Sequence, residues 1–569
     1  MTTRPLRSAL AFLALAYAIT AGASYAQTPT VVGQPTQLSF FGMNTYFTGL
    51  ERNGRDGDAG VSTLIARSRQ LGAAWAREEL SWANLERDGQ GRWLWTHFDR
   101  RLLEVAQAGY GIIGMLLTTP AWARVGDCST RIGRYAAAGV VAQSYWCPPA
   151  DPQTFANYVF AVVERYDGDG NADAPGSPRV AVWQIWNEPN AWETWPGTPA
   201  EYTAILQAGY AAAKAADPTA TVATGGLYVL DSAWQDTVGH SDGLRFLAEG
   251  LTARPAAWYS FDALAIHPYM PDVAPDQPGI YGAVTLWGRL VTTRAWLSER
   301  TAHLGGPPRP IWISELGWST CAASESDCYA GAAVGTAALS ADAPPNLAWH
   351  LTLGPTAAQA YATEPCSQGA EHCAAELAAT VGPVALIGKS EQQQANYLVR
   401  AHAIALALGV QHVNWFQLED KFDGSARNFW EEAALYRTAA LGYVPKPAAL
   451  AYSVMVNQLG AATFVGFGPL HTFVPNPTGP SPAARFDLRF RTANNLLVDI
   501  VWRTDGTEEV TVPLIGGRVP QIFSRDGAAW PTRVVGGVAA FSLGEAPVYV
   551  WQRTWLTAAR LMLPIVRQR

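Results

Sequence analysis

The fold is indicated most clearly by residues 182–190, whose sequence is Val-Trp-Gln-Ile-Trp-Asn-Glu-Pro-Asn. The first five residues are mostly apolar, which is typical of a strand buried on both faces in a parallel sheet. Pro189 cannot donate a hydrogen bond to a neighbouring strand, so the strand has to stop before it. Glu188 is therefore expected at the carboxyl end of a buried strand.

Residues 311–318 repeat this arrangement with the sequence Ile-Trp-Ile-Ser-Glu-Leu-Gly-Trp. An apolar strand again ends at a glutamate, Glu315. About three strand–helix units separate Glu315 from Glu188. In a closed barrel such strands lie roughly opposite one another across the mouth, so the two carboxylates can face each other.

Eight strand candidates alternate with amphipathic helices between residues 38 and 460. The strands are Leu38–Asn44, Ala74–Glu79, Gly111–Thr118, Val180–Asn187, Thr221–Gly225, Phe261–His267, Pro310–Leu316 and Gln411–Gln417. Apolar residues recur at helical spacing around 61–71 and 98–106, and further helices are predicted at 153–166, 199–216, 282–303, 391–408 and 446–459. Strand–helix repeated in this way predicts an α/β fold, a (β/α)8 TIM barrel.

Alternation with period two replaces this pattern after residue 461. It runs through 485–490 and 496–502, and Asp505-Gly506 and Asp526-Gly527 have the composition of hairpin turns. Residues 461–556 are therefore predicted to form a C-terminal antiparallel β-sandwich domain. The N-terminal segment 27–37 is a candidate extra strand of it, and 557–569 form a short basic tail.

The first 26 residues have the features of a signal peptide. Arg4 and Arg7 precede an apolar run, and Ser24-Tyr25-Ala26 places small residues where a signal peptidase cuts. The alternative, a membrane anchor, is disfavoured because the run is short, and no later stretch is long enough to span a bilayer. We therefore expect a secreted or periplasmic protein.

Export agrees with the six cysteines, which lie in three neighbouring pairs. An even number of cysteines in an exported chain predicts disulfides, and pairing by proximity gives Cys128–Cys147, Cys321–Cys328 and Cys366–Cys373. Free buried thiols are the alternative. The two long connections that contain these pairs, 119–151 and 317–390, follow strands, so they belong at the carboxyl-terminal face of the barrel.

Composition narrows the range of partners. The net charge is −7 and only 15% of residues are charged, which argues against a nucleic-acid partner because that would need a basic surface. The 23 tryptophans are suited both to a core and to a sugar-binding cleft. Composition alone does not separate these two uses, and the oligomeric state does not follow from the sequence.

Two facing carboxyl groups are the arrangement that glycosidic cleavage requires. One protonates the leaving oxygen while the other attacks or supports the anomeric carbon. The alternative for a single glutamate is a structural ion pair at a strand end. Two glutamates at matching barrel positions, one of them within Asn-Glu-Pro, favour catalysis by Glu188 and Glu315.

These two motifs resemble those of the clan A retaining glycoside hydrolases, most closely the family 39 and family 5 branches. Trp186-Asn187-Glu188-Pro189-Asn190 and Ser314-Glu315-Leu316-Gly317-Trp318 carry the resemblance, which extends over about residues 38–460. It implies Glu188 as the acid/base and Glu315 as the nucleophile.

The same resemblance implies five substrate-site residues. Arg77 would support the nucleophile, Asn187 would bind the sugar 2-hydroxyl, His267 and Tyr269 would line the site, and Trp415 would lie under the reacting sugar. Each has a structural alternative. Arg77 can pair with Glu78 or Glu79, His267 can be a core histidine, and Trp415 can be core packing; Trp192 and Trp195 can form a subsite wall or the core of a loop.

The sequence thus predicts a secreted retaining hydrolase that acts on O-glycosidic bonds, β-linked, in an oligo- or polysaccharide. The alternatives are a non-catalytic carbohydrate-binding protein on the same barrel and a secreted scaffold. No cofactor or metal is expected. Asp167, Asp169, Asn171 and Asp173 have the spacing of a calcium loop, but Pro178 stands where its bidentate glutamate belongs, which favours a solvated turn.

Overall fold

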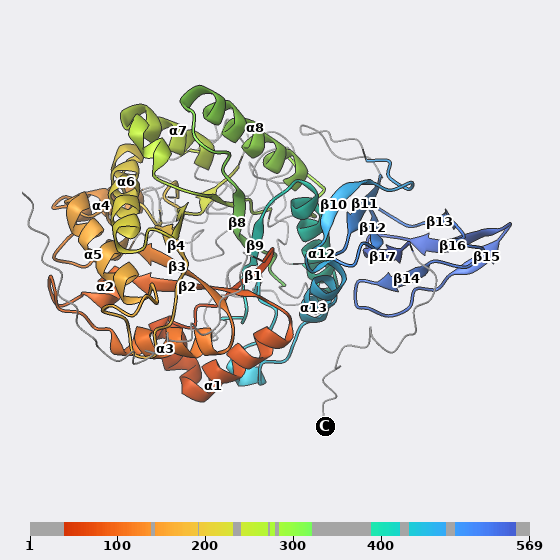
Figure 1. Ribbon diagram of the computed structural model, residues 1–569, viewed down its shortest axis with the longest axis horizontal. Helices are drawn as coiled ribbons and strands as arrows, with labels where there is room; N and C mark the ends of the chain where they lie inside the picture. Colours follow the sequence, from red (N-terminus) through yellow and green to blue (C-terminus); the bar gives the residue numbers. More distant parts are fainter. Residues whose placement is uncertain are drawn as a thin grey trace, which may run out of the picture.

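A (β/α)8 barrel forms the larger part of the protein (Figure 1). The computed structural model describes residues 39–137, 143–191, 193–230, 241–270, 273–278, 284–320, 389–421, 432–473 and 484–552. The barrel strands are β1 (Phe41–Asn44), β2 (Trp75–Ser81), β3 (Gly111–Leu117), β4 (Val182–Ile185), β5 (Thr221–Thr224), β6 (Leu227–Tyr228), β7 (Leu264–His267), β8 (Ile311–Leu316) and β9 (His412–Trp415).

The strands pair in parallel in the order β5-β4-β3-β2-β1-β9-β8-β7-β6. β5 and β6, the first and last strands in this order, are two halves of one barrel strand, because only Gly225 and Gly226 separate them. A parallel bridge between Ala223 and Ala263 joins β5 to the chain entering β7 and closes the ring. The predicted barrel is confirmed, and each of the eight predicted strand segments overlaps one of its strands, although β2 extends two residues beyond the predicted Ala74–Glu79.

Helices surround the ring and connect its strands. They are α1 (Leu50–Gln70), α2 (Trp82–Leu85), α3 (Thr96–Gln107), α4 (Cys128–Ala137), α5 (Pro152–Arg165), α6 (Pro199–Ala216), α7 (Gly243–Ala253), α8 (Leu286–Leu304), α12 (Glu391–Ala407) and α13 (Pro447–Leu459). The sequence did not predict α7, the helix after the split strand. It begins where Asp242 accepts hydrogen bonds from the amides of Leu244 and Arg245, which a helix amino terminus leaves unpaired.

The barrel interior is filled in layers. The layer nearest the amino ends of the strands is apolar and consists of Trp75, Ile113, Val182, Ala223, Ala263, Ala265 and Trp312. His412 and Asn414 approach β1 so closely here that a Cβ atom at Gly42 would lie 2.0 Å from Oδ1 of Asn414. Only glycine fits at this position. The barrel is therefore a packed core, and its open surface is at the carboxyl-terminal mouth.

The connection after β3 carries the disulfide that the structure describes. Cys128 begins α4, and Cys147 follows the short 3-10 helix at Ser144–Trp146. Their bond confirms one of the three predicted pairs. Cys321, Cys328, Cys366 and Cys373 lie outside the described residues, as do the signal peptide, segment 27–37 and tail 557–569.

Two antiparallel sheets follow the barrel. The larger sheet has the order β10-β11-β12-β17-β14 and the smaller one β13-β16-β15. The strands are β10 (Thr463–Phe467), β11 (Arg485–Arg491), β12 (Leu497–Arg503), β13 (Glu508–Pro513), β14 (Gln521–Ser524), β15 (Arg533–Val535), β16 (Val538–Leu543) and β17 (Val548–Trp551). Val501, Val548, Val550 and Phe541 are among the residues that fill the space between them, so the predicted β-sandwich is confirmed.

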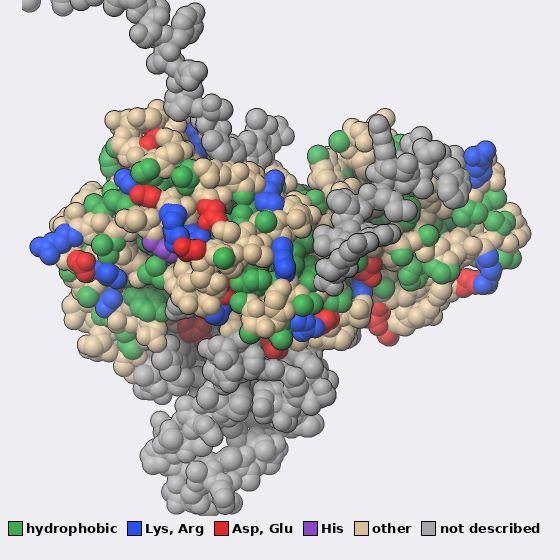
Figure 2. All heavy atoms as spheres, turned by 90° about the horizontal axis from the view of Figure 1, so that it is seen from below, with side chains coloured by type: hydrophobic (Ala, Val, Ile, Leu, Met, Phe, Trp, Pro, Cys, Tyr) green, Lys and Arg blue, Asp and Glu red, His purple; other side chains and the backbone are tan. Residues whose placement is uncertain are grey.

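The larger sheet buries both of its faces. Alternate residues, such as Ile500, Trp502 and Tyr549, point away from the smaller sheet and belong to the same apolar cluster as the barrel. The sandwich therefore lies against one side of the barrel (Figure 2), next to α12 and α13 (Figure 1). Nε1 of Trp551 donates to Oε1 of Gln458 on α13 over 2.6 Å.

A buried polar group also crosses this interface. The Arg400 guanidinium on α12 lies 3.3 Å from both oxygens of Asp276 and donates to the carbonyls of Arg503 and Glu545 in the sandwich. Asp276 also accepts a 2.6 Å hydrogen bond from Nε1 of Trp502. Neither Arg400 nor Asp276 is exposed to solvent, so the contact is part of the protein interior.

Two further sequence features have structural outcomes. No described helix is long and apolar enough to cross a bilayer. The turn between α5 and β4 brings the carboxylates of Asp167, Asp169 and Asp173 together, with one oxygen of each within 4.8 Å of the others. This turn precedes β4, so it lies at the end of the barrel opposite the mouth.

Candidate active site

Glu188 is placed at the mouth by an abrupt change of backbone direction after β4. Trp186 has φ = 73° and Glu188 has φ = 46°, both in the left-handed region that interrupts a strand. The turn is fixed from behind, because Trp186 is fully buried and its indole nitrogen donates to the carbonyl of Thr194 over 2.7 Å. The hydroxyl of Thr194 donates to the carbonyl of Glu188 itself.

Glu315 is aimed into the mouth by an irregularity in β8. The pairing of β8 with β9 shifts between Ile313 and Leu316. Such a bulge lets Ser314 and Glu315, which are adjacent in sequence, both contact the interior instead of opposite faces. The Glu315 carboxylate is 4% exposed. It accepts hydrogen bonds from Arg77, from the Tyr269 hydroxyl at 2.9 Å and from the Tyr46 hydroxyl at 3.4 Å.

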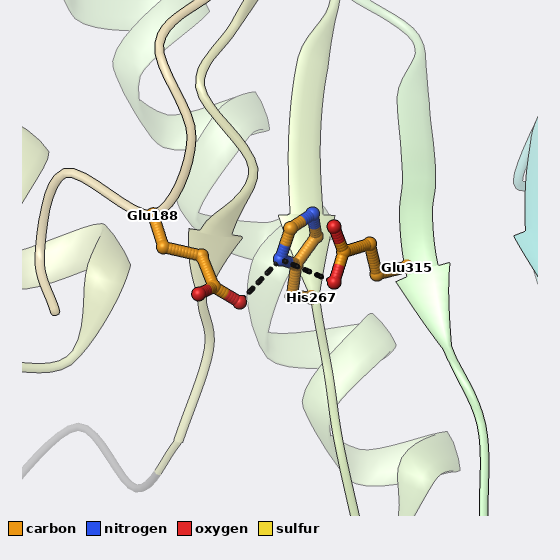
Figure 3. A group of neighbouring side chains, drawn as sticks. All are labelled: Glu188, His267 and Glu315. Carbon is orange, nitrogen blue, oxygen red and sulfur yellow. Dashed lines mark hydrogen bonds and ion pairs between the residues drawn. The ribbon is translucent and has the colours of Figure 1, made fainter. Parts of the chain in front are cut away.

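His267 lies between the two glutamates (Figure 3). Its Nδ1 is 2.7 Å from Oε1 of Glu188 and 3.7 Å from Oε2 of Glu315. Its Nε2 is 2.9 Å from the Ser314 hydroxyl. The ring has room because the split strand has glycine beside it: a Cβ atom at Gly226 would lie 1.9 Å from Nε2.

A layer of polar side chains supports the glutamates from below. Arg77 donates to Oε1 of Gln184 over 2.7 Å, to Oδ1 of Asn44 over 2.9 Å and to Oδ1 of Asn187 over 2.8 Å, besides Glu315. Gln184 in turn donates to the Ser314 hydroxyl. Four barrel strands, β1, β2, β4 and β8, are thus tied together at or near their ends beneath the mouth, which fixes the position of the nucleophile candidate.

The two carboxyl groups are close enough to act on one bond. One oxygen of Glu188 and one of Glu315 lie within 4.8 Å of each other. Retaining glycosidases have carboxyl groups about 5–5.5 Å apart, whereas inverting ones need about 6.5–9.5 Å to admit a water molecule. The separation matches the retaining arrangement, and the predicted closeness of the two groups is confirmed.

Their surroundings push the two pKa values in opposite directions. Burial raises the pKa of Glu188 above its ordinary value, and the hydrogen bond from His267 offsets this only in part. Burial would also raise the pKa of Glu315, but the charges of His267 and Arg77 and the hydrogen bonds from Tyr269 and Arg77 outweigh it and lower the pKa. The opposed directions favour keeping a proton on Glu188 while Glu315 is ionised.

The same three side chains have donor atoms of the kinds that bind metal ions. Glu188, His267 and Glu315 each offer one atom within 4.8 Å of the others. The Arg77 guanidinium already forms an ion pair with Glu315, however, and its positive charge disfavours the binding of a metal cation at the same carboxylate. The arrangement is therefore better suited to proton transfer and nucleophilic attack than to metal binding.

One predicted site residue is placed elsewhere. Trp415 is fully buried and stacks on Trp318 and His402, with ring centroids 6.0 and 6.2 Å away. His402 belongs to α12, so Trp415 points from β9 into the layer between barrel and helices. The next residue, Phe416, contacts Tyr46 and Tyr269 beside Glu315, with centroids 6.2 Å away. The prediction of Trp415 as a sugar platform is therefore wrong, and Phe416 is the aromatic residue at this place.

The other predicted site residues meet at the mouth. Arg77, Asn187, His267 and Tyr269 all contact Glu188, Glu315 or each other. Sequence reasoning missed Tyr46, Gln184 and Ser314; the last two lie in the quoted strand motifs, and their polarity within an apolar strand was the available signal. Trp195 is fully buried against Trp186, so it belongs to the core of its loop. Trp192 lies outside the described residues.

The fold, a (β/α)8 barrel followed by a β-sandwich, is similar to that of solved glycoside hydrolases. Comparison with solved structures gives a TM-score of 0.55 and 16% identity to a family 39 glycoside hydrolase from the gut symbiont Bacteroides cellulosilyticus WH2, covering 87% of this chain and 79% of that one. A family 39 β-xylosidase from Caulobacter crescentus gives 0.50 and 13%, covering 92% and 98%.

A family 51 α-L-arabinofuranosidase from Bifidobacterium longum also gives a TM-score of 0.50, at 12% identity, covering 92% of this chain and 97% of that one. A search with the sequence finds no matching family model and no matching curated protein. At these identities the likeness concerns the fold. It confirms the resemblance to clan A enzymes at that level.

Proposed function

We propose that the protein is a retaining glycoside hydrolase with Glu315 as nucleophile and Glu188 as acid/base. The observation that carries the proposal is a pair of glutamates within 4.8 Å whose surroundings shift their pKa values in opposite directions. A structural ion pair does not need this opposition. A double-displacement reaction needs an ionised nucleophile and a protonated acid at the same time.

Each residue then has a defined part in two steps. In the first, a carboxylate oxygen of Glu315 bonds to the anomeric carbon, the bond to the leaving oxygen breaks, and the Glu188 proton passes to that oxygen. In the second, Glu188 takes a proton from water, the water oxygen bonds to the anomeric carbon and the bond to Glu315 breaks. Arg77 and Tyr269 stabilise Glu315 as an anion, and His267 holds the Glu188 carboxyl group by its hydrogen bond.

The proposed substrate is an oligo- or polysaccharide with β-linked units. A distance below 4.8 Å between one oxygen of Glu188 and one of Glu315 supports retention but does not select a sugar. The structural neighbours are described as a β-xylosidase and an α-L-arabinofuranosidase, among others. A panel of aryl glycosides, β-xylosides first, is therefore the appropriate first screen.

The roles of the two glutamates are tested with two variants and azide. Glu315→Ala removes the nucleophile, so no glycosyl-enzyme forms with any substrate. Glu188→Ala removes proton donation, which a dinitrophenyl glycoside hardly needs, so the first step survives and the second stalls. Azide needs no deprotonation. It should restore turnover in the Glu188→Ala variant and give a β-glycosyl azide, identified by NMR.

Two results would contradict the proposal. The first is an α-glycosyl azide from the Glu315→Ala variant together with full activity of the Glu188→Ala variant on unactivated glycosides. Glu315 would then still be the nucleophile, but the acid/base would be a residue other than Glu188. A wild-type protein that binds sugars without hydrolysing any aryl glycoside would support the non-catalytic alternative.

We also propose that the protein acts outside the cytoplasm. The apolar segment after Arg4 and Arg7 and the small residues up to Ala26 support export. The bond between Cys128 and Cys147 supports it independently, because disulfides persist mainly in oxidising compartments. Amino-terminal sequencing of the mature protein tests this, with Gln27 as the expected first residue.

A further inference from the structure

A third carboxylate, that of Glu79, occupies the mouth of the barrel. Side chains alternate along β2, and the interior face carries Trp75 in the apolar layer and then Arg77 in the polar layer. Glu79 follows on the same face, one layer nearer the mouth. It is opposite Met115 of β3 in the strand register.

Glu79 lacks the partners that its neighbour has. Glu78 points outward, and its two oxygens accept hydrogen bonds from the hydroxyls of Thr45 and Thr48 and from the Thr48 amide. No hydrogen bond or ion pair joins the Glu79 carboxylate to any residue in the part of the chain that the structure describes. Glu78 is fully buried, whereas Glu79 is only partly buried. An ionisable group of this kind has acceptor capacity left for a ligand.

The surroundings of Glu79 belong to the site already described. Burial raises its pKa, and the charges of Lys421 and Arg77 oppose that rise. The Lys421 ammonium lies 4.4 Å from the centroid of the Tyr46 ring, and the Tyr46 hydroxyl donates to Glu315. Glu79 and Lys421 therefore lie on the Tyr46 side of the nucleophile, within reach of a sugar whose anomeric carbon is at Glu315.

We propose that Glu79 is a specificity residue that accepts hydrogen bonds from ring hydroxyls of the sugar bonded to Glu315, with Lys421 donating to the same hydroxyl oxygens. The inference rests on the proposed function and extends it to the substrate class. A carboxylate accepts from two adjacent hydroxyls, and an ammonium donates to oxygen. Together they match the O–H groups of a neutral sugar.

The charges in the mouth favour neutral sugars over uronic acids. Among the described residues, the carboxyl groups of Glu79, Glu188 and Glu315 face the guanidinium of Arg77 and the ammonium of Lys421. Arg77 is already bound to Glu315. A uronate would add a fourth carboxyl group to this set, and an acceptor-only carboxylate at Glu79 gives it no hydrogen bond.

The test is a thermodynamic cycle in which one change is made in the protein and the other in the substrate. We would measure kcat/KM for wild type and Glu79→Gln on the best aryl glycoside of the panel and on its 2-, 3- and 4-deoxy counterparts. Glu79→Gln should lower kcat/KM about 10- to 100-fold on the parent, as expected for losing hydrogen bonds to a charged group. The loss should shrink to less than about threefold on the deoxy substrate that lacks the contacted hydroxyl.

Control variants separate recognition from other effects. Glu299→Gln makes the same chemical change on the exposed surface of α8 and should leave every rate unchanged. If Glu79→Gln lowered kcat/KM equally on the parent and on all deoxy substrates, Glu79 would act only through the charge of the site, and the inference would be wrong. Unchanged kcat/KM on the parent would also overturn it. If Glu79→Gln does not fold, Lys421→Gln measured in the same cycle gives the second test.

Calorimetric titration makes the outcome independent of catalysis. Wild type should bind the neutral monosaccharide of the best substrate at least about tenfold more tightly than its uronic acid, and Glu79→Gln should lose most of that preference. A wild type that binds the sugar with this preference but hydrolyses nothing would overturn the proposed function alone. A hydrolase whose preference survives Glu79→Gln would overturn the inference alone.

Discussion

At the scale of single residues, Glu188 and Glu315 differ mainly in their hydrogen-bond donors and nearby charges. Glu315 is buried and Glu188 is largely so, and desolvation raises the pKa of each. Of the two glutamates, only Glu315 accepts hydrogen bonds from Arg77 and Tyr269, and the charge of His267 together with these contacts reverses the direction of its pKa shift. The strand ends supply the carboxylates, and the neighbouring side chains decide which of them is the acid.

These shifts predict a bell-shaped dependence of kcat/KM on pH. Activity requires Glu315 without its proton, so it rises as pH passes upward through the lowered pKa of Glu315. It also requires Glu188 with its proton, so it falls as pH passes through the raised pKa of Glu188. Tyr269→Phe removes a hydrogen-bond donor to Glu315, so it should raise the pKa of Glu315 and move the acidic limb to higher pH, with a smaller effect on the alkaline limb. An acidic limb that stays in place would contradict this assignment.

The sequence predicted the positions of the two catalytic candidates correctly, because the end of a strand shows where a side chain lies. It failed for the aromatic residue of β9, because the sequence does not show which face of the strand each residue points to. Glu188 and Glu315 were identified because each follows an apolar strand segment, and Pro189 marks the end of the first of them. The family resemblance implied Trp415 as a site residue, but neighbouring strand residues point to opposite faces, and it is Phe416 that lies beside Tyr46 and Tyr269. A single sequence does not determine which of two adjacent aromatic residues faces inward.

At the scale of elements, the split between β5 and β6 makes room for His267. The sequence predicted one strand at Thr221–Gly225, since the apolar run ends at a pair of glycines. The chain resumes as β6 beyond them, and α7 follows. β6 has only two residues, too few for a periodic pattern. In α7, however, Leu244, Leu247 and Leu251 recur at helical spacing, so the signal for this helix was present in the sequence.

The space at Gly226 should be required for activity. Gly226→Ala places a Cβ atom 1.9 Å from Nε2 of His267, so the ring has to move away from Ser314 and Glu188. A displacement of about 1 Å in a catalytic group costs about 100-fold, and we expect a loss of that order in kcat/KM. Gly54→Ala on α1, where an added Cβ atom meets nothing within 4 Å, is the matched control and should keep full activity. Near-normal activity of Gly226→Ala would show that His267 tolerates displacement.

The disulfide fastens the connection that covers Trp186. Trp146, just before Cys147, packs on Trp186 with ring centroids 6.1 Å apart, behind the turn that positions Glu188. Replacing both Cys128 and Cys147 by serine should lower the free energy of unfolding by about 3 kcal/mol, measured by denaturant titration. The same change produced in wild type by a reductant would verify that the bond is responsible, and unchanged stability in both experiments would contradict the prediction.

At the scale of the whole molecule, the barrel and the sandwich share one apolar interior. Trp502 and Tyr549 of the larger sheet belong to the same cluster as the barrel residues. The sequence distinguished the two regions by their periodicity, helical before residue 460 and strand-like after it. It did not indicate that the larger sheet would be covered on both faces. The alternation of residue types along a strand does not show which elements pack on each face of the sheet.

The buried contact among Arg400, Asp276 and Trp502 should contribute strongly to stability. Asp276→Asn removes the charge that balances the fully buried Arg400, and leaving a buried charge without its partner costs about 3–5 kcal/mol. Thermal unfolding of this variant should occur at clearly lower temperature than that of wild type. Glu509→Gln, which removes an exposed partner of Arg533, is the control and should change stability by less than about 1 kcal/mol. Equal melting temperatures for the two variants would refute this account.

A sheet with no free face also limits how such a protein can change through recombination. A module joined by a linker can be exchanged between genes, because nothing else in the protein depends on its surface. Here the strand residues Ile500, Trp502 and Tyr549 complete the packing of the barrel helices, so a foreign sandwich would leave α12 and α13 uncovered. The two regions are therefore expected to be inherited together, and substitutions on one side of their boundary to be accompanied by compensating substitutions on the other.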